Sequence, residues 1–241
     1  FLARALLCAC EEDAEVREVP EGKWADVVRR GQESGELPWS VGVIRIYETP
    51  VPGERIVNAT QVNGVDATDP LQLTRAEIEG RRQAYRILAF LRAHAPGYEN
   101  ASIAAMPAVV GVRESRRFLG LEYLTRDDLL EGRQRDDAVV KQAEFVIDIH
   151  NPEGAGQAEG SARNVKPYDI PYGCLVPKEV GGLLLAGRCI SGSHDAHASY
   201  RVCCIAMAIG AAAGAAAALA SGESIPPRGV DPREVRALLE L

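Results

Sequence analysis

Apolar and polar positions follow different periods in two neighbouring parts of the chain. Residues 39–50 and 54–70 are rich in β-branched side chains and flank the turn PVPG, which predicts two strands joined by that turn. Residues 69–97 instead carry apolar side chains at helical spacing and end in a Pro-Gly pair, which predicts an amphipathic helix. Its apolar positions are Ile78, Tyr85, Leu88 and Leu91.

Shorter elements follow this helix. The runs MPAVVGV (106–112) and EFVIDIH (144–150) predict strands. Between them, Thr125 and Asp128 form an N-terminal capping signature for a short helix. Residues 168–182 predict a pair of strands punctuated by prolines.

The last part of the chain combines an apolar run, a loop and a long helix. GLLLAGR (182–188) predicts a strand of the kind buried in a parallel sheet. The loop CISGSHDAHA separates it from an alanine-rich helix, whose expected N-cap is Ser199. Since helix N-terminal amides carry partial positive charge, this arrangement predicts a site for a negatively polarised group. Asp231 and Pro232 open a final amphipathic helix.

The alanine-rich helix has two interpretations. Residues 199–220 have no charge after Arg201 and are long enough to cross a bilayer core of about 30 Å. Only four of these residues strongly favour membrane insertion, and together they contribute roughly −1 to −2.5 kcal/mol to the free energy of insertion. Gly210 and Gly214 allow close approach to a sheet or a cofactor. A buried helix of a soluble protein is therefore favoured over a membrane span.

Composition narrows the class of protein. Apolar residues make up 46% of the 241 residues and the formal charge is −7, which fits a globular protein without a nucleic-acid partner. The six cysteines contain no CxxC pair, which indicates reduced thiols and a cytoplasmic location. The apolar N-terminus FLARALLCAC has no initiator methionine, and we interpret it as the end of a helix in a fragment rather than a signal peptide.

Several runs together carry a family resemblance. They are VGVRESRRFLGLEYLTRDDLL, FVIDIHNPEG and the block from Tyr168 to Ala220, with NATQVNGVDATDP and LTRAEIEGRRQA beside them. Over residues 38–222 the chain resembles the FAD-dependent oxidoreductase family that shares the two-domain, fumarate-reductase-like flavoprotein architecture. The resemblance implies an α/β fold: the C-terminal portion of a Rossmann-type FAD/NAD(P)-binding domain with an inserted α+β substrate domain.

The same resemblance implies a division of the chain and a cofactor site. The expected parts are a peripheral segment (1–37), a substrate or cap domain (38–180), a returning FAD-domain strand, loop and helix (181–223) and a helical tail (224–241). The implied cofactor is FAD, and the helix dipole would stabilise negative charge on reduced flavin. The implied cofactor-binding residues are Gly187, Arg188, Ser191, His194, Ser199, Tyr200, Arg201 and Val202.

One family motif is missing from the sequence. A strand, GxGxxG and a helix normally bind the pyrophosphate of the dinucleotide, and the nearest match here, GAGQAEG (154–160), has the wrong spacing. The sequence therefore predicts a truncated or split gene product. An N-terminal FAD-binding subunit or a missing segment would then supply pyrophosphate binding.

Charged and nucleophilic residues supply the candidate chemistry. Arg113, Arg116 and Arg117 could anchor a substrate carboxylate or the flavin, or form salt bridges with Glu114 and Glu122. His150 is a candidate proton donor or a hydrogen-bonded spacer. The expected catalytic residues are His150, Arg113 and Arg117.

Other reactive residues have simpler expected roles. His194 and His197 with Asp195 lack a further ligand cluster, so no metal is expected. Small buried packing roles are expected for Cys189, Cys203 and Cys204, and packing roles in the core or between domains for Tyr123 and Tyr172.

The leading hypothesis is an FAD-dependent oxidoreductase fragment that transfers a hydride through flavin N5 to or from a small-molecule substrate. The alternative is a non-catalytic remnant or subunit that completes a flavin site with a separate FAD-binding partner. No membrane partner is expected in either case.

Overall fold

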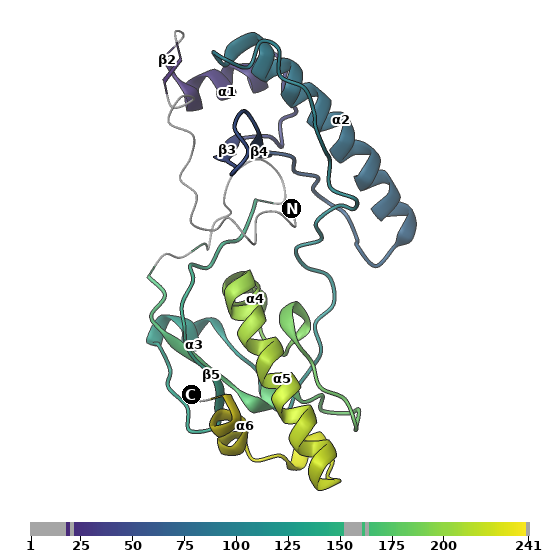
Figure 1. Ribbon diagram of the computed structural model, residues 1–241, viewed down its shortest axis with the longest axis vertical. Coiled ribbons are helices and arrows are strands. Elements are labelled where there is room, and N and C mark those ends of the chain that lie inside the picture. The colour runs from purple at the N-terminus through teal and green to yellow at the C-terminus, as the bar shows by residue number, and fades with distance from the viewer. Residues whose placement is uncertain (1–17, 20–21, 152–160, 162–163, 240–241) are drawn as a thin grey trace. The chain divides into compact units, whose positions relative to one another are not determined.

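The chain divides into two compact units (Figure 1). The computed structural model describes residues 18–19, 22–151, 161 and 164–239. Unit 1 comprises residues 1–115 and 150–158, and unit 2 comprises residues 116–149 and 159–241. The functional divisions expected from the sequence, at residues 38, 181 and 224, stay predictions beside this partition by contacts.

The described residues of unit 1 form two short antiparallel strand pairs and two helices. The hairpin predicted around PVPG is confirmed, with Ile46 opposite Val57. The long helix begins after Asp69, whose side chain accepts a hydrogen bond from the Leu71 N–H at 2.9 Å. The elements are β1 (Glu18–Val19), β2 (Gly22–Lys23), α1 (Trp24–Glu33), β3 (Arg45–Glu48), β4 (Arg55–Asn58) and α2 (Pro70–His94).

The helix predicted over 69–97 is confirmed as α2, but half of its predicted apolar face is wrong. Leu91 is buried, whereas Ile78 and Tyr85 are exposed. The buried face runs through Ala76 and Gln83 toward the C-terminal end of the helix. Ile78 and Tyr85 each lie two residues beyond one of these, about 200° round the helix, and so face away from the core.

Part of the segment expected to be peripheral belongs to the unit 1 core. Val27, Val28 and Leu37 are buried in one cluster with Ile46 and Phe90. The predicted helix end at FLARALLCAC lies outside the described residues. The strand predicted at residues 106–112 is absent from the structure, where this segment is irregular.

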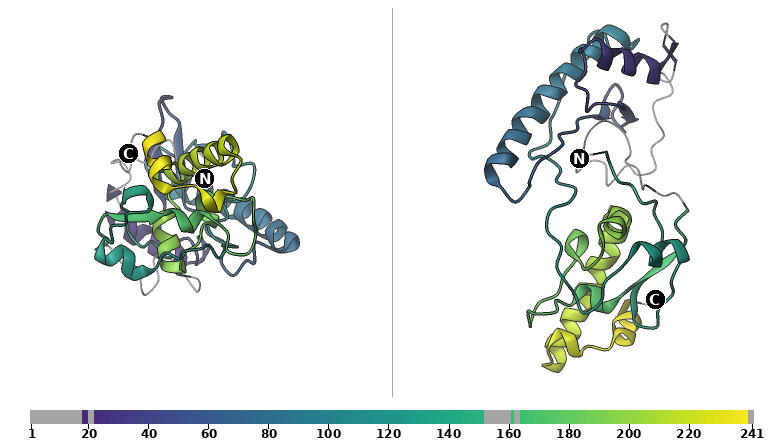
Figure 2. Two further views of the ribbon diagram at one scale, coloured as in Figure 1. Left: turned by 90° about the horizontal axis from the view of Figure 1, so that it is seen from below. Right: turned by 180° about the vertical axis from the view of Figure 1, so that it is seen from behind.

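Unit 2 is built around one antiparallel pair of strands, with two helices packed against it (Figure 2). Both α5 and α6 contact β5 and each other. Its elements are α3 (Arg126–Glu131), β5 (Ala138–Ala143), β6 (Tyr168–Pro171), the 3₁₀ turns η3 (Tyr172–Leu175), η4 (Gly187–Cys189) and η5 (Pro227–Gly229), and the helices α4 (His194–Tyr200), α5 (Cys203–Glu223) and α6 (Pro232–Leu239). The predicted capping box of α3 and the predicted final helix α6 are confirmed.

Three strand predictions in unit 2 are wrong. The strand expected at 144–150 lies earlier, as β5, and residues 168–182 provide one strand followed by a 3₁₀ turn. GLLLAGR forms no strand: Leu185 N–H donates to Leu175 O at 2.8 Å, and the chain then enters η4. Among the described residues each named sheet is an antiparallel pair, so this run has no parallel neighbours to extend. The loop GAGQAEG lies outside the described residues.

The expected start of the alanine-rich helix also needs correction. Ser193 caps α4, with its side chain accepting from Ala196 N–H, and Ser199 lies in the last turn of that helix. Two residues separate α4 from the long helix α5, which begins after Val202 without a side-chain cap.

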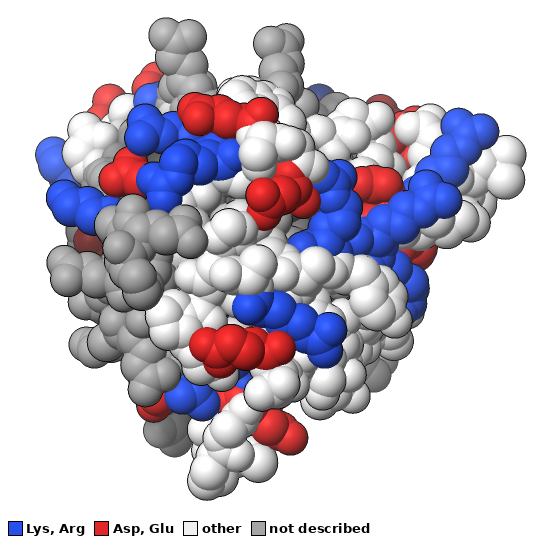
Figure 3. All heavy atoms as spheres, turned by 90° about the horizontal axis from the view of Figure 1, so that it is seen from above, with Lys and Arg blue, Asp and Glu red and all other residues white. Residues whose placement is uncertain are grey.

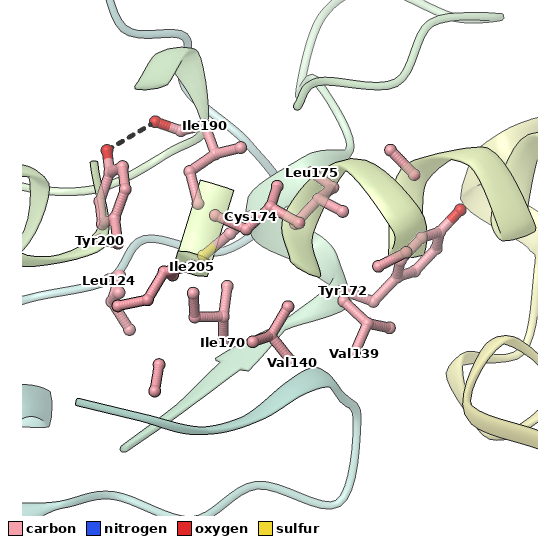
Figure 4. Close-up of a cluster of buried hydrophobic side chains, with 14 of the residues drawn as sticks. Leu124, Val139, Val140, Ile170, Tyr172, Cys174, Leu175, Ile190, Tyr200 and Ile205 are labelled. Atoms are coloured by element: carbon pink, nitrogen blue, oxygen red, sulfur yellow. Dashed lines mark hydrogen bonds between the residues drawn. The ribbon is translucent and has the colours of Figure 1, made fainter. Parts of the chain in front are cut away.

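One face of α5 is buried and the opposite face is exposed. Ile205 and Ile209 lie in the unit 2 core (Figure 4 labels Ile205), whereas Met207 is 74% exposed. A Cβ atom at Gly210 or Gly214 would meet nothing within 4 Å, so nothing in the described chain uses the close approach that these glycines allow. By length and composition α5 is apolar enough to cross a membrane, and 39% of its apolar window is buried.

The charged side chains on one face of the molecule are mixed in sign. Figure 3 shows basic and acidic residues interspersed on this face, with uncharged surface between them. Such a surface generates no extended field of one sign on the side that is seen.

Candidate functional site

The predicted cofactor loop of unit 2 is held by a distant segment of the same unit. Residues 117–124 run beside residues 189–193 and exchange hydrogen bonds with them. This pairing places the Arg117 side chain at the loop that the sequence singled out. The bonds are Phe118 N–H to Cys189 O (3.0 Å), Leu124 N–H to Ser191 O (3.3 Å), Ser193 N–H to Leu124 O (2.8 Å) and Arg117 Nε to Gly192 O (3.0 Å).

A glycine makes this pairing possible. A Cβ atom on Gly120 would lie 2.5 Å from Gly173 O and 2.9 Å from Ser191 Cβ. Both distances are far below van der Waals contact, so no larger residue fits without moving backbone. The segment therefore approaches the loop at backbone distance.

Cationic side chains gather around His197 on α4. The His197 ring is buried and meets the Tyr200 ring edge-on, with centroids 5.4 Å apart. Burial first, and then the charges of Arg117, Arg201, His194 and Arg188, lower the pKa of His197 to about 3. His197 is therefore neutral at physiological pH, and the positive charges that act on it would also favour an anion. All four neighbours that act on it were singled out from the sequence.

Asp148 offsets part of this charge, and Asp195 pairs with another arginine of unit 2, Arg126. Arg201 Nη2 lies 3.0 Å from Asp148 Oδ2 and also donates to the Asp148 carbonyl. Arg126 Nη1 lies 3.7 Å from Asp195 Oδ1. Arg201 is thus fixed in orientation.

The predicted serine and tyrosine residues differ in their contacts. Ser199 Oγ donates to Phe145 O at 2.7 Å, and Tyr200 OH donates to Ile190 O at 3.1 Å (Figure 4). Their side chains thus bond within unit 2. Ser191 is fully buried, and its Oγ has no hydrogen-bond partner among the described residues. An unsatisfied buried hydroxyl is costly, so Ser191 is suited to bind a further polar group.

Three of the predicted residues lie in a 3₁₀ turn or at a helix start: Gly187 and Arg188 in η4, and Val202 before α5. Gly187 has a φ of +73°, in the left-handed region that favours glycine, and a Cβ there would meet nothing within 4 Å. Arg188, which follows it in η4, is exposed. Val202 is the N-cap of α5, so the first amides of that helix have neither an intrahelical acceptor nor a side-chain cap.

The three predicted catalytic residues come from both units. Arg113 and His150 belong to unit 1, and Arg117 belongs to unit 2. A ring nitrogen of His150, Nδ1, lies 3.3 Å from Gln61 Oε1, within a group of side-chain amides that includes Asn63. These amides were missed from the sequence, where only the charged residues were weighed.

Several residues with other expected roles also need correction. Cys174 is buried, but Cys189 is only partly buried and Cys203 and Cys204 are exposed, so their expected burial is wrong. Tyr172 packs in the core as predicted and donates to Pro227 O at 2.7 Å, while Tyr123 is 46% exposed. Within the described ranges, no group of three or more His, Cys, Asp or Glu side chains could hold a metal ion.

These features define unit 2 as an α/β unit with an anion-favouring loop beside an uncapped helix. A profile of the family described as FAD dependent oxidoreductase matches residues 9–239. The chain belongs to this family, whose cofactor is FAD. No curated protein and no solved structure matches it significantly.

The residues of unit 2 fit the flavin end of that cofactor. The orphaned Ser191 hydroxyl, the open turn at Gly187 and the uncapped amides of α5 are groups that can hold a polarised ring edge. The sequence offers no GxGxxG for the pyrophosphate.

Proposed function

We propose that this chain supplies the flavin-side site of an FAD-dependent oxidoreductase acting on a small-molecule substrate. The observation that carries the proposal is the group of cationic side chains around His197, directly before the uncapped N-terminus of α5. The family match supports it. When bound, FAD supplies hydride transfer through N5 of its flavin ring.

The proposed residue roles follow from charge and burial. The first amides of α5, after Val202, would donate to an electron-rich edge of the flavin, and Gly187, Arg188, Ser191 and His194 would line the same site. Arg201, fixed by Asp148, would contribute charge rather than a flexible contact. Because His197 is neutral at physiological pH, it adds no positive charge to the site there.

Substrate anchoring and proton transfer are assigned to the remaining candidates. We propose that Arg117 binds an anionic part of the substrate at the unit 2 loop. As separate proposals within unit 1, Arg113 is a further anion-binding residue and His150 is a proton donor. The α/β arrangement would be Rossmann-type, with an inserted substrate domain. The free thiols of unit 2 support a reducing, cytoplasmic location.

A second candidate function is supported by the exposed face of α5. Gly210 and Gly214 lie on this helix with open space above them, and Met207 is exposed nearby. In this alternative the chain completes a flavin site together with a separate FAD-binding partner.

Flavin binding tests both candidates. The purified chain is titrated with FAD and followed by flavin absorbance and fluorescence. We expect Arg188→Ala to weaken binding about tenfold, the size of one charge-assisted hydrogen bond. The matched control is Arg233→Ala, an exposed arginine of α6 that pairs with Asp231.

Each result has a distinct meaning. Equal effects of Arg188→Ala and Arg233→Ala would overturn the assignment of the site to unit 2. If the chain binds no flavin when it is given FAD alone but binds flavin together with an FAD-binding partner, the second candidate is supported. Recovery of the chain only with detergent would contradict both and favour a membrane-spanning α5.

A further inference from the structure

Glu122 and Asp137 are carried to the same place in unit 2 by backbone hydrogen bonds. The Glu122 N–H donates to Gly173 O at 3.2 Å. The Tyr172 N–H donates to Asp137 O at 3.0 Å. Because Tyr172 and Gly173 are consecutive residues of η3, the two acidic residues flank the same turn.

The Glu122 side chain lies directly over this turn. A Cβ atom on Gly173 would be only 2.6 Å from Glu122 Cγ, so the absence of a side chain at Gly173 makes the room. Glu122 Oε1 lies 3.6 Å from Arg135 Nη1. Glu122 Oε2 is buried, and no hydrogen-bond donor within the described part of the chain reaches it.

A proton on Glu122 resolves this unsatisfied oxygen. The carboxyl groups of Glu122 and Asp137 are in hydrogen-bonding contact, yet two carboxylates have only acceptors. Burial and the neighbouring Asp137 charge raise the pKa of Glu122, and the Arg135 charge opposes this only in part. The pair can therefore form a hydrogen bond when one of its members is protonated.

The other charged groups around the pair do not replace this proton. Arg135 also contacts Asp128, with Nη2 to Oδ1 at 3.3 Å, so its charge is shared. Asp128 is paired with Arg133 at 2.7 Å and adds a further negative charge near Glu122. The buried Cys174 thiol of η3 is neutral, because burial raises its pKa to about 12.

We propose that Glu122 and Asp137 share one proton in the folded protein, with Glu122 donating a hydrogen bond to the Asp137 carboxylate when it is protonated, and that this pH-sensitive pair positions segment 117–124. This segment binds the loop 189–193 through Leu124 and Arg117, so Glu122 is a positioning residue for that loop. The pair consists of unit 2 side chains alone. It therefore does not depend on the proposed flavin site.

The direction of the pH dependence follows from the raised pKa of Glu122. The stabilisation by the pair is complete below the pKa of the unfolded chain, about 4.3. It is lost as pH rises through the pKa of the folded state, because ionisation places two carboxylates in contact. Between these two pKa values each pH unit weakens folding by up to about tenfold in the unfolding equilibrium constant, and above the folded-state pKa both states are ionised and the stabilisation is gone.

The test compares the full-length chain with Glu122→Gln by chemical denaturation at a series of pH values from 5 to 9. Glutamine keeps the shape of glutamate and donates to Asp137 at every pH. We expect the variant to lose the decline in stability that the wild type shows with rising pH. Glu179→Gln, which removes the same charge at an exposed position, should keep the wild-type decline.

Infrared spectroscopy provides the second measurement. The wild type should show the C=O stretch of a protonated carboxyl group that disappears as pH rises, and Glu122→Gln should lack it. If Glu122→Gln does not fold, Asp137→Asn replaces it, because an asparagine amide donates to the ionised Glu122. Parallel pH profiles for the wild type and the folded variant, or a carboxyl band that persists in the variant, would overturn the proposal.

Discussion

The two units stabilise their folds with different kinds of contact. In unit 1, side chains from α1 and the β3–β4 hairpin pack on α2, and buried Gln83 bridges the backbone of Gln61. In unit 2, backbone also packs on backbone, with Gly120 against Gly173 and segment 117–124 hydrogen-bonded to loop 189–193. Side chains can shift to absorb a substitution, whereas paired backbone cannot. Unit 2 should therefore tolerate less change around its candidate site.

Core truncation is the strongest way to test whether the units are separate. We expect Phe90→Ala to destabilise unit 1 by about 4 kcal/mol and Leu124→Ala to destabilise unit 2 by about 3 kcal/mol, because each removes a buried side chain and leaves a cavity. Hydrogen exchange with mass spectrometry should show lost protection only in the mutated unit. Equal loss in both units after either substitution would show that they unfold together.

Added methyl groups test the difference in tolerance. Gly120→Ala places its methyl group against the Gly173 carbonyl, and we expect a cost of about 2 kcal/mol from the forced backbone shift. Gly31→Ala in α1 meets the Phe90 ring, at 2.4 Å from Cε2, and gains up to about 1 kcal/mol of helix propensity. Denaturant midpoints should therefore fall further for Gly120→Ala. The reverse order would contradict the contrast between the units.

The contrast also explains which elements could be predicted from the sequence. The PVPG hairpin, α2 and the Thr125–Asp128 cap depend on residues within one turn or helix, and all three were predicted. GLLLAGR is apolar enough for a strand, but its Leu185 N–H bonds to the carbonyl of Leu175, a residue that no local pattern identifies. The buried face of α2 was mispredicted for the same reason, because the surface on which the helix packs determines which of its side chains are buried.

The roles of the site residues named from the sequence stay predictions, although several of these residues act on one side chain. Arg117, Arg188, His194 and Arg201 were chosen from the sequence, and all act on His197 in the structure. The Glu122–Asp137 pair was missed, because their proximity depends on two backbone bonds to η3.

Helix caps provide a smaller comparison between the units. Thr125→Ala removes one half of the α3 capping box, in which the Thr125 N–H and hydroxyl both donate to buried Asp128, and we expect a cost of about 1.5 kcal/mol. Asp69→Ala removes the exposed cap of α2, with an expected cost of about 0.5 kcal/mol. Thermal denaturation of both variants should rank them in this order. A larger drop in melting temperature for Asp69→Ala would contradict this ranking, because the exposed cap would then contribute more to the stability of α2 than its exposure indicates.

Two helix glycines give the smallest expected change and the sharpest test of the exposed α5 face. Gly80 in α2 and Gly214 in α5 both have open space where a Cβ would lie, so alanine at either position should stabilise its helix by up to about 1 kcal/mol. Denaturation of the isolated chain should give similar gains for the two variants. In the presence of an FAD-binding partner, Gly80→Ala should keep its gain. Gly214→Ala would lose its gain if the partner packs on this face, and an unchanged gain there would show that α5 remains exposed.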